Sequence, residues 1–279
     1  MEDDKKNHIS EPSMMSNIFN NFFTDIGKNL AESLPKSCKD DDPTLLITNN
    51  LKSLYLRPIT SSEIEDLIDN LNTQKSVPSF CISIKFIKIS AKVISSILAK
   101  LFNLCIKEGI FPEAFKISEI LPVHKTGSKT IVTNYRPIAL LSVFSKLLEK
   151  CIYIQIVKFL NLNNQFYDHQ FGFRENSSTE NATLQIYQHL LMKLEKKETV
   201  CSVFVDLKKD FDTVDHSVLL NKLRKYGIRG ITYKRLESYI TNRAQYTIIN
   251  GYKSKNRTIR CGIPQGSTLG PLLYLMYYI

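Results

Sequence analysis

The chain has 279 residues, of which 43% are hydrophobic, so it is long enough to bury a core and its composition excludes a disordered protein. Lysine and arginine number 37 against 27 aspartates and glutamates, which gives a formal net charge of +10. This charge suits a polyanionic partner such as a nucleic acid, although a basic surface also serves solubility alone.

The six cysteines occur singly, with no Cys-x-x-Cys pair and no short cluster with histidine. We therefore expect reduced thiols and no zinc site. The polar start, Met1 to Asn7, does not resemble a signal peptide, and no apolar run approaches the roughly 18 residues of a membrane span. The expected location is intracellular, in the nucleus or cytoplasm, without membrane association.

The N-terminal part predicts one helix between two polar stretches. Residues Met1 to Ser13 are polar and expected to be disordered, whereas Met15 to Leu34 has apolar residues at helical spacing. The acidic stretch Lys36 to Pro43 is expected to be a solvated linker.

Two further helices are expected before the first strand. Ser61 or Ser62 would cap the first of them. Its apolar stripe consists of Ile64, Leu67, Ile68 and Leu71. The second covers Ala91 to Glu108 and stops at Gly109.

Strands and helices then alternate along the chain. A strand is predicted over Ile117 to Val123, and an amphipathic helix over Ser142 to Leu160. The run Val200 to Val205 is almost continuously apolar, which predicts a central strand buried on both faces.

The C-terminal third predicts three helices and a hairpin. A helix would begin at Asp215 or His216 and end at Gly227, and another would cover Ile231 to Thr241. The dipeptide Asn250-Gly251 predicts a hairpin turn, after which residues 257–261 return as a strand. Ser267 would cap a last helix over residues 269–278.

Asp206 is the first candidate for chemistry. Nucleotidyl transfer uses two divalent ions about 4 Å apart, held by carboxylates from different chain segments. An aspartate at the end of a buried strand is held rigidly, and the Leu207 carbonyl offers a second hard oxygen ligand. The alternative is an aspartate that only ends the strand and caps the next turn. Asp210 and Asp212 add negative charge nearby, and Asp215 is better explained as a helix cap.

Phe211 and the loop around Gln265 are candidates for nucleotide binding. A ring at Phe211 could lie under an incoming sugar and collide with a 2′ hydroxyl, although such a residue is more often part of the core. Gly262 to Gly266 has little side-chain bulk, so its backbone can approach bases and sugars while Gln265 donates to a nucleotide. Alone, Pro-Gln-Gly indicates only a turn.

Two further pairs, each with at least one basic residue, complete the candidates. Lys125 and Arg136 flank a loop and could hold a triphosphate, because both are charged and Arg136 can bind two oxygens; both could also be ordinary surface residues. Phe173 and Arg174 offer an aromatic face and a cation to a template strand, and Phe173 could equally be packing.

Taken in order, these segments resemble the conserved blocks of reverse transcriptases from non-LTR (LINE-type, jockey-like) retrotransposons. The blocks are Leu121 to Gly127, Asn134 to Ile138, Gln170 to Arg174, Phe204 to His216 and Gly262 to Pro271. The resemblance covers roughly residues 53–279, and even residues 19–23 are similar to the leader that precedes this domain.

The resemblance implies an α+β, right-hand polymerase fold, with mixed fingers over residues 58–198, a partial ferredoxin-like palm over 199–279, no thumb, and a leader over 1–57. It implies an RNA template, a DNA primer, deoxynucleoside triphosphates and Mg²⁺. Asp206 and the Leu207 carbonyl would bind metal, with Asp206 catalytic. Lys125, Arg136, Leu207, Phe211, Gln265 and Gly266 would bind nucleotide, and Phe173 and Arg174 would bind template. Oligomeric state is left open.

Four departures limit what is carried over. Val77 to Phe80 stands where the family has a Gly-x-Asp-Gly turn, and Asp210 replaces a small residue. The paired aspartates of the family would follow Ile279, and the upstream endonuclease is not seen. We therefore expect that this chain as written does not polymerise. The alternative function is that of a non-catalytic RNA-binding remnant, whose affinity would depend strongly on salt.

Overall fold

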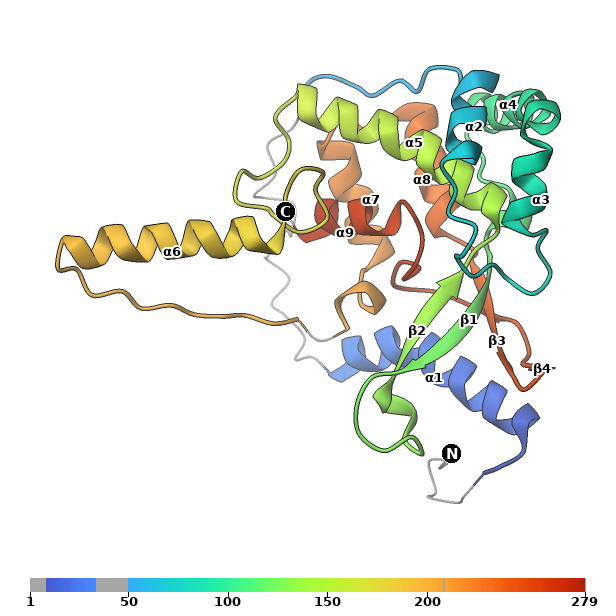
Figure 1. Cartoon of the computed structure of the whole chain (residues 1–279), viewed down its shortest axis with the longest axis horizontal. Coiled ribbons are helices and arrows are strands. Elements are labelled where there is room, and N and C mark those ends of the chain that lie inside the picture. The colour runs from blue at the N-terminus through green and yellow to red at the C-terminus, as the bar shows by residue number, and fades with distance from the viewer. Residues whose placement is uncertain (1–8, 34–49, 208, 279) are drawn as a thin grey trace.

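The computed structural model describes residues 9–33, 50–207 and 209–278. Helices gather at one end of the molecule, a sheet and the first helix lie at the other, and one helix projects sideways from the body (Figure 1). The expected combination of helices with a sheet is confirmed. The predicted linker over residues 36–43 lies outside the described residues.

The first helix, α1, covers Pro12–Ser33. The helix predicted from Met15 is therefore confirmed, but Pro12 and Ser13 belong to it and not to a disordered tail, which corrects that prediction. Proline is well suited to a first helical position because its missing N–H has no partner there.

Helix α2 covers Ser61–Asp69, and its cap is Thr60 instead of the predicted Ser61 or Ser62. The Glu63 backbone N–H donates to Thr60 Oγ1 over 3.2 Å, and the Thr60 N–H donates to Glu63 Oε2 over 2.9 Å. This reciprocal capping box satisfies two N–H groups at once, which explains why the helix begins one residue after threonine.

Helix α3, Ile84–Ile89, was not predicted, whereas α4 covers Ala91–Glu108 as predicted. Gly109 ends α4 with a φ of +69°, a left-handed conformation that glycine adopts without strain. Burial of Phe102 and Leu98 on one side of α4 follows from the helical spacing of its apolar residues.

The sheet is mixed. Strands β1 (Ile117–His124) and β2 (Tyr135–Leu140) form an antiparallel hairpin, and β3 (Ala244–Ile249) lies parallel to β1 on its other side. Strands β4 (Tyr252–Lys253) and β5 (Arg257–Thr258) both pair with β3. The predicted turn at Asn250-Gly251 is confirmed, with both residues at positive φ.

The main core surrounds α5, Val143–Leu162, which Ser142 caps by accepting from the Ser145 N–H over 3.0 Å. Fully buried Leu148, Ile152 and Ile156 on α5 belong to this core. The other helices of the C-terminal third are α7 (His216–Lys225), α8 (Gly230–Ile240) and α9 (Gly270–Tyr278). Three short 3-10 turns are η1 (Glu113–Phe115), η2 (Val132–Asn134) and η3 (Asp210–Asp212).

A buried carboxylate joins α5 to α9. Glu149 is fully buried and accepts hydrogen bonds from the Thr268 and Leu269 N–H groups over 2.7 and 3.1 Å. The hydroxyls of Ser145 and Tyr239 donate to the same carboxylate over 3.0 and 3.3 Å. Glu149 thereby holds the start of α9, and the glycine-rich loop before it, against the core.

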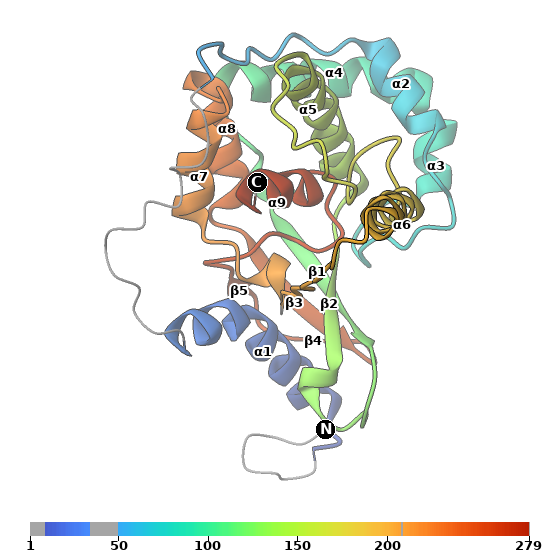
Figure 2. The same cartoon turned by 90° about the vertical axis from the view of Figure 1, so that its left-hand side faces the viewer.

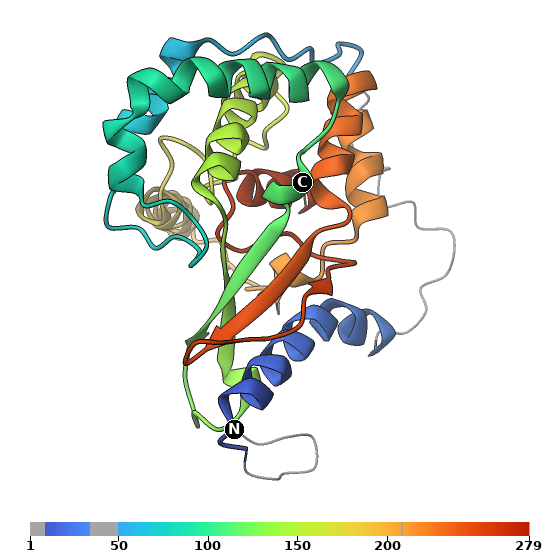
Figure 3. The ribbon, with the colours of Figure 1, turned by 90° about the vertical axis from the view of Figure 1, so that its right-hand side faces the viewer.

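Helix α1 runs along the sheet at the end of the molecule away from α4 and α5 (Figures 2 and 3). Its Phe19, Phe23 and Ile26 form a second apolar cluster with Ile120 and Ala139 of the hairpin. The segment that resembles a leader is thus an integral part of the folded body.

Helix α6, Thr179–Glu195, and the segment after it correct a prediction. None of the residues of α6 is buried, and residues 199–207 run back from its tip without forming a strand (Figure 1). Val203, Phe204 and Val205 are more than 80% exposed, so the central strand predicted over Val200 to Val205 is wrong in this structure. A strand needs a hydrogen-bonding neighbour, and among the described residues none lies alongside this segment.

Candidate functional site

The β1–β2 hairpin carries both basic residues predicted to hold a triphosphate. Arg136 lies on β2 opposite Val123, and Lys125 directly follows β1. The Lys125 N–H donates to the Asn134 carbonyl over 2.8 Å, which closes the hairpin between them. Both side chains are exposed, so the hairpin presents two positive charges to solvent.

The Gln265 loop lies against the same hairpin. The Ala139 N–H on β2 donates to the Gln265 carbonyl over 2.7 Å. Gly266 has a φ of +114°, and a Cβ added to it would lie 2.7 Å from the Ala139 carbonyl oxygen. Glycine is therefore required at this close approach of two backbones, whereas the sequence analysis expected the approach to be to bases and sugars.

Backbone hydrogen bonds join this loop to the segment that begins α7. The Ile263 N–H donates to the Phe211 carbonyl over 2.9 Å, and the Gly262 N–H donates to the Val214 carbonyl over 2.8 Å. His216 Nε2 lies 2.8 Å from the Gly262 carbonyl oxygen, so this nitrogen carries the donated proton. Burial lowers the pKa of His216, against the effect of that hydrogen bond.

Asp212 was not predicted as a site residue, yet it holds the Gln265 side chain. Gln265 Nε2 donates to Asp212 Oδ1 over 2.9 Å. Burial raises the pKa of Asp212 to about 6, opposed by the Gln265 hydrogen bond and by Lys209. In the sequence, nothing distinguishes Asp212 from the neighbouring Asp210 and Asp215, and its hydrogen bond with Gln265 appears only in the folded arrangement.

Asp215 is a helix cap, as predicted. Its Oδ1 accepts from the Ser217 and Val218 N–H groups over 2.7 and 2.9 Å. Although burial opposes the change, these hydrogen bonds hold the pKa of Asp215 below its ordinary value.

Phe211 and Phe173, predicted for sugar and template, are in contact. Their ring centroids are 5.7 Å apart in an edge-to-face arrangement. Tyr274 of α9 stacks on Phe211 with a centroid distance of 4.6 Å and an interplanar angle of 7°. These three rings form an aromatic cluster that reaches the surface at Phe173, which is 53% exposed.

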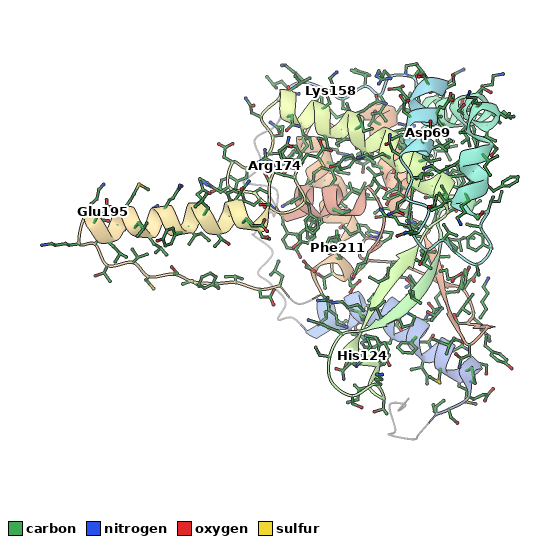
Figure 4. The ribbon with its side chains drawn as sticks, viewed as in Figure 1. Asp69, His124, Lys158, Arg174, Glu195 and Phe211 are labelled. Carbon is green, nitrogen blue, oxygen red and sulfur yellow. The ribbon has the colours of Figure 1, made fainter. Side chains whose placement is uncertain are left out.

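Arg174 lies beside this cluster, where α6 leaves the body, and Glu195 marks the far tip of that helix (Figure 4). Arg174 Nη1 donates to the Tyr167 carbonyl over 2.8 Å, and the Arg174 guanidinium lies 5.1 Å from the Phe166 ring centroid. Arg174 and Phe173 line the same cavity, with a volume of about 250 Å³. The two predicted template residues therefore share one surface.

Among the described residues, the hydrogen bonds and ring contacts that join the site do not involve Asp206 or Leu207. Both are exposed on the extended segment that returns from α6. Among the described residues, no group of three or more His, Cys, Asp or Glu side chains is arranged to hold a metal ion. In this arrangement, Asp206 and the Leu207 carbonyl do not make up a two-metal site.

Helix α1 also contacts the site, through the segment that contains Asp212. A side chain at Gly27 would collide with the Asp212 carbonyl oxygen and with Cys261 Sγ, so α1 approaches the segment before α7 as closely as backbone allows. Phe23 of α1 lines a small cavity of about 40 Å³ together with Asp212 and Gln265. Sequence alone did not indicate this contact.

Within the residues that the structure covers, no helix combines the length and the apolar character needed to cross a membrane.

Comparison with known proteins identifies what this chain resembles. The family model described as "Reverse transcriptase (RNA-dependent DNA polymerase)" matches residues 123–278. These residues include the end of β1, all of β2, the aromatic cluster and the Gln265 loop.

Several curated relatives come from mobile elements of Drosophila melanogaster. The chain is 34% identical to the "Probable RNA-directed DNA polymerase from transposon BS", over 81% of this chain and 25% of the relative. It is 31% identical to the "RNA-directed DNA polymerase from mobile element jockey", over 81% of this chain and 25% of the relative. A third relative, the "Probable RNA-directed DNA polymerase from transposon X-element", is 29% identical over 80% of this chain and 24% of the relative. The chain thus spans about a quarter of the length of these relatives.

Proposed function

This chain belongs to the reverse transcriptase family, among the enzymes of LINE-type retrotransposons, and we propose that it forms the nucleotide- and template-binding part of an RNA-directed DNA polymerase. The substrates of this nucleotidyltransferase would be an RNA template, a DNA primer and deoxynucleoside triphosphates. The observation that carries the proposal is the attachment of the Gln265 loop both to β2 and to the segment that holds Phe211.

Each residue of this site has a part in the proposed function. Lys125 and Arg136 bind the triphosphate oxygens from the hairpin, because both charges are exposed there. Gln265 contacts the nucleotide with the part of its amide that Asp212 leaves free, and Gly266 allows the backbone to approach it. Phe211 supports the sugar and disfavours a 2′ hydroxyl by steric collision.

The template would pass over the aromatic cluster. Phe173 is exposed enough for a base to stack on it, and Arg174 supplies a cation beside it. We assign the fingers to residues 58–198 and the partial palm to residues 199–279, preceded by the leader over 1–57.

Reverse transcriptases use divalent metal ions, which stabilise charge on the reacting phosphates. From the resemblance to the family, we propose that Asp206 and the Leu207 carbonyl are ligands of Mg²⁺. These two donors alone do not form a complete metal site in the arrangement described above. The chain's own residues therefore account for binding and orientation and not for the chemical step.

Nucleotide binding tests the proposal directly. Deoxynucleoside triphosphate affinity can be measured by calorimetric titration of the chain with an RNA–DNA primer–template. Gln265→Ala should weaken binding about fivefold, since a hydrogen bond contributes about 1 kcal/mol, and Arg136→Ala should weaken it further. The matched control is Gln74→Ala, which removes an exposed glutamine outside the site. Unchanged affinity in Gln265→Ala and Arg136→Ala would refute the assignment.

We also propose that this chain by itself binds RNA without extending a primer. Asp206 is exposed, and among the described residues it belongs to no group of three or more acidic, His or Cys side chains that could hold a metal, which favours this second function. Primer extension on an RNA template with Mg²⁺, compared between the wild-type chain and Asp206→Ala, should give no product in either. Extension that depends on Asp206 would contradict it.

A further inference from the structure

A basic cleft adjoins the nucleotide site. The cleft has a volume of about 380 Å³ and lies between α2, α5 and the loop that precedes α9. This volume is within the range of about 300–1,000 Å³ that is usual for ligand sites. The residues that matter for its chemistry are Lys75, Lys146, Lys150, Gly266, Ser267 and Thr268.

The charges that line the cleft all have one sign. Three lysines contribute to its wall, and the described residues that line it include no aspartate or glutamate. Within the described part of the chain, no salt bridge engages Lys75, Lys146 or Lys150. The charged side chains that line the cleft are therefore all positive, and the carboxylate that acts on Lys146 belongs to Glu149, which is buried outside the lining.

The charged form of Lys146 is disfavoured by its surroundings. Burial lowers the pKa of Lys146; the charge of Glu149 opposes this change, and the positive charge of Lys75 acts in the same direction as burial. The oxygens of Glu149 already accept four hydrogen bonds from the start of α9, Ser145 and Tyr239. An external anion in the cleft would relieve the repulsion between Lys75 and Lys146.

The cleft is continuous with the site. Gly266 forms part of its wall and directly follows Gln265, which faces Asp212. A strand whose phosphates lie along the lysines would therefore bring its next base to the Gln265 loop. Val77 on this wall is the first residue of the stretch that departs from the family's Gly-x-Asp-Gly turn, and Lys75 lies two residues before it.

We propose that this cleft binds the phosphate backbone of a single-stranded RNA, with Lys75, Lys146 and Lys150 as its contacts. This inference rests on the proposed function, because it names the path by which template enters the same site. The chemistry recognised is a row of phosphates and not a base sequence, since lysine ammonium groups act as point charges.

The test is the salt dependence of RNA binding by the whole chain. Fluorescence anisotropy with a labelled, unstructured RNA gives the affinity between about 50 and 200 mM KCl. The variant carrying Lys75→Gln, Lys146→Gln and Lys150→Gln should bind about tenfold more weakly at low salt. Its slope of log affinity against log salt should be smaller by about 1 to 2.

A matched control separates the cleft from net charge. Lys92→Gln, Lys100→Gln and Lys107→Gln remove the same number of charges from exposed positions on α4. Equal loss of affinity in the two triple variants, or no loss in the cleft variant, would overturn the proposal. Lys75→Gln alone, at an exposed position, repeats the test in case substitution of the half-buried Lys146 impairs folding.

Two other outcomes are informative. Loss of triphosphate affinity with unchanged RNA binding would show that the cleft holds the nucleotide's phosphates, and would overturn the RNA assignment. Absence of RNA binding by the wild-type chain would refute the proposal that the cleft binds RNA. If that same chain still binds nucleotide, and Gln265→Ala weakens this binding, the nucleotide part of the proposed function stands.

Discussion

Replacement of Asp212 by asparagine should change how stability depends on pH. Asp212→Asn keeps an oxygen that can accept from Gln265 Nε2 but removes the carboxylate's proton equilibrium. Burial raises the pKa of the native carboxyl from 3.8 to about 6, with Asp210 raising it and Lys209 lowering it. Because the native state holds the proton more tightly, Asp212 contributes most to stability below about pH 3.8.

That contribution is lost as the pH rises through about 6. The difference between the ordinary pKa of 3.8 and the native pKa of about 6 corresponds to at most about 3 kcal/mol of stability. Because solvent has partial access to Asp212, we expect a contribution of about 1–3 kcal/mol. The free energy of unfolding of Asp212→Asn, relative to wild type, should therefore increase by this amount between about pH 4 and about pH 7.

Urea denaturation followed by circular dichroism, at several pH values for both proteins, measures this difference. Asp215→Asn is the matched control, because hydrogen bonds from α7 lower the pKa of Asp215 against the effect of burial. Its carboxylate contributes stability above its unfolded pKa and loses it as the pH falls, so its difference curve has the opposite sign. A pH-independent difference between wild type and Asp212→Asn would refute the reasoning.

Two further substitutions test how the site is held. Glu149→Ala leaves the start of α9 without its buried acceptor and should lower the free energy of unfolding by about 3 kcal/mol or more, measured by urea denaturation. Glu195→Ala on exposed α6 is the control and should leave the free energy of unfolding nearly unchanged. Equal losses of stability in Glu149→Ala and Glu195→Ala would contradict the role of Glu149 in holding α9. Gly266→Ala places a methyl group against Ala139 at a φ of +114° and should cost about 1–3 kcal/mol in thermal unfolding, with weaker nucleotide binding. Gly172→Ala, at ordinary φ, should be tolerated; a stable Gly266→Ala with wild-type nucleotide affinity would count against the close approach.

Predictions that depend on local signals agree best with the structure. The helix over Ala91–Glu108, its end at Gly109 and the turn at Asn250-Gly251 follow from spacing and from residues that tolerate positive φ. The cap of α2 differs by one position, because Thr60 and Glu63 satisfy two backbone groups together.

Predictions that depend on partners distant in sequence agree less well. The apolar run Val200 to Val205 has the composition of a buried strand, but composition does not supply the neighbouring strand that buries it. Asp212 was overlooked for the same reason, since its role depends on Gln265 and on burial by other segments.

The sequence by itself determined the family of this protein and most of its candidate residues. Residues such as Gly266 and Arg136 reveal their chemistry through backbone freedom or charge, which belongs to the residue type. Tertiary structure decided which of them meet: it joined Gln265 to Asp212, set three lysines around one cleft, and left Asp206 exposed. The physical reason is that burial, electrostatic repulsion and strand pairing arise between segments far apart in the chain, so only the folded arrangement determines them.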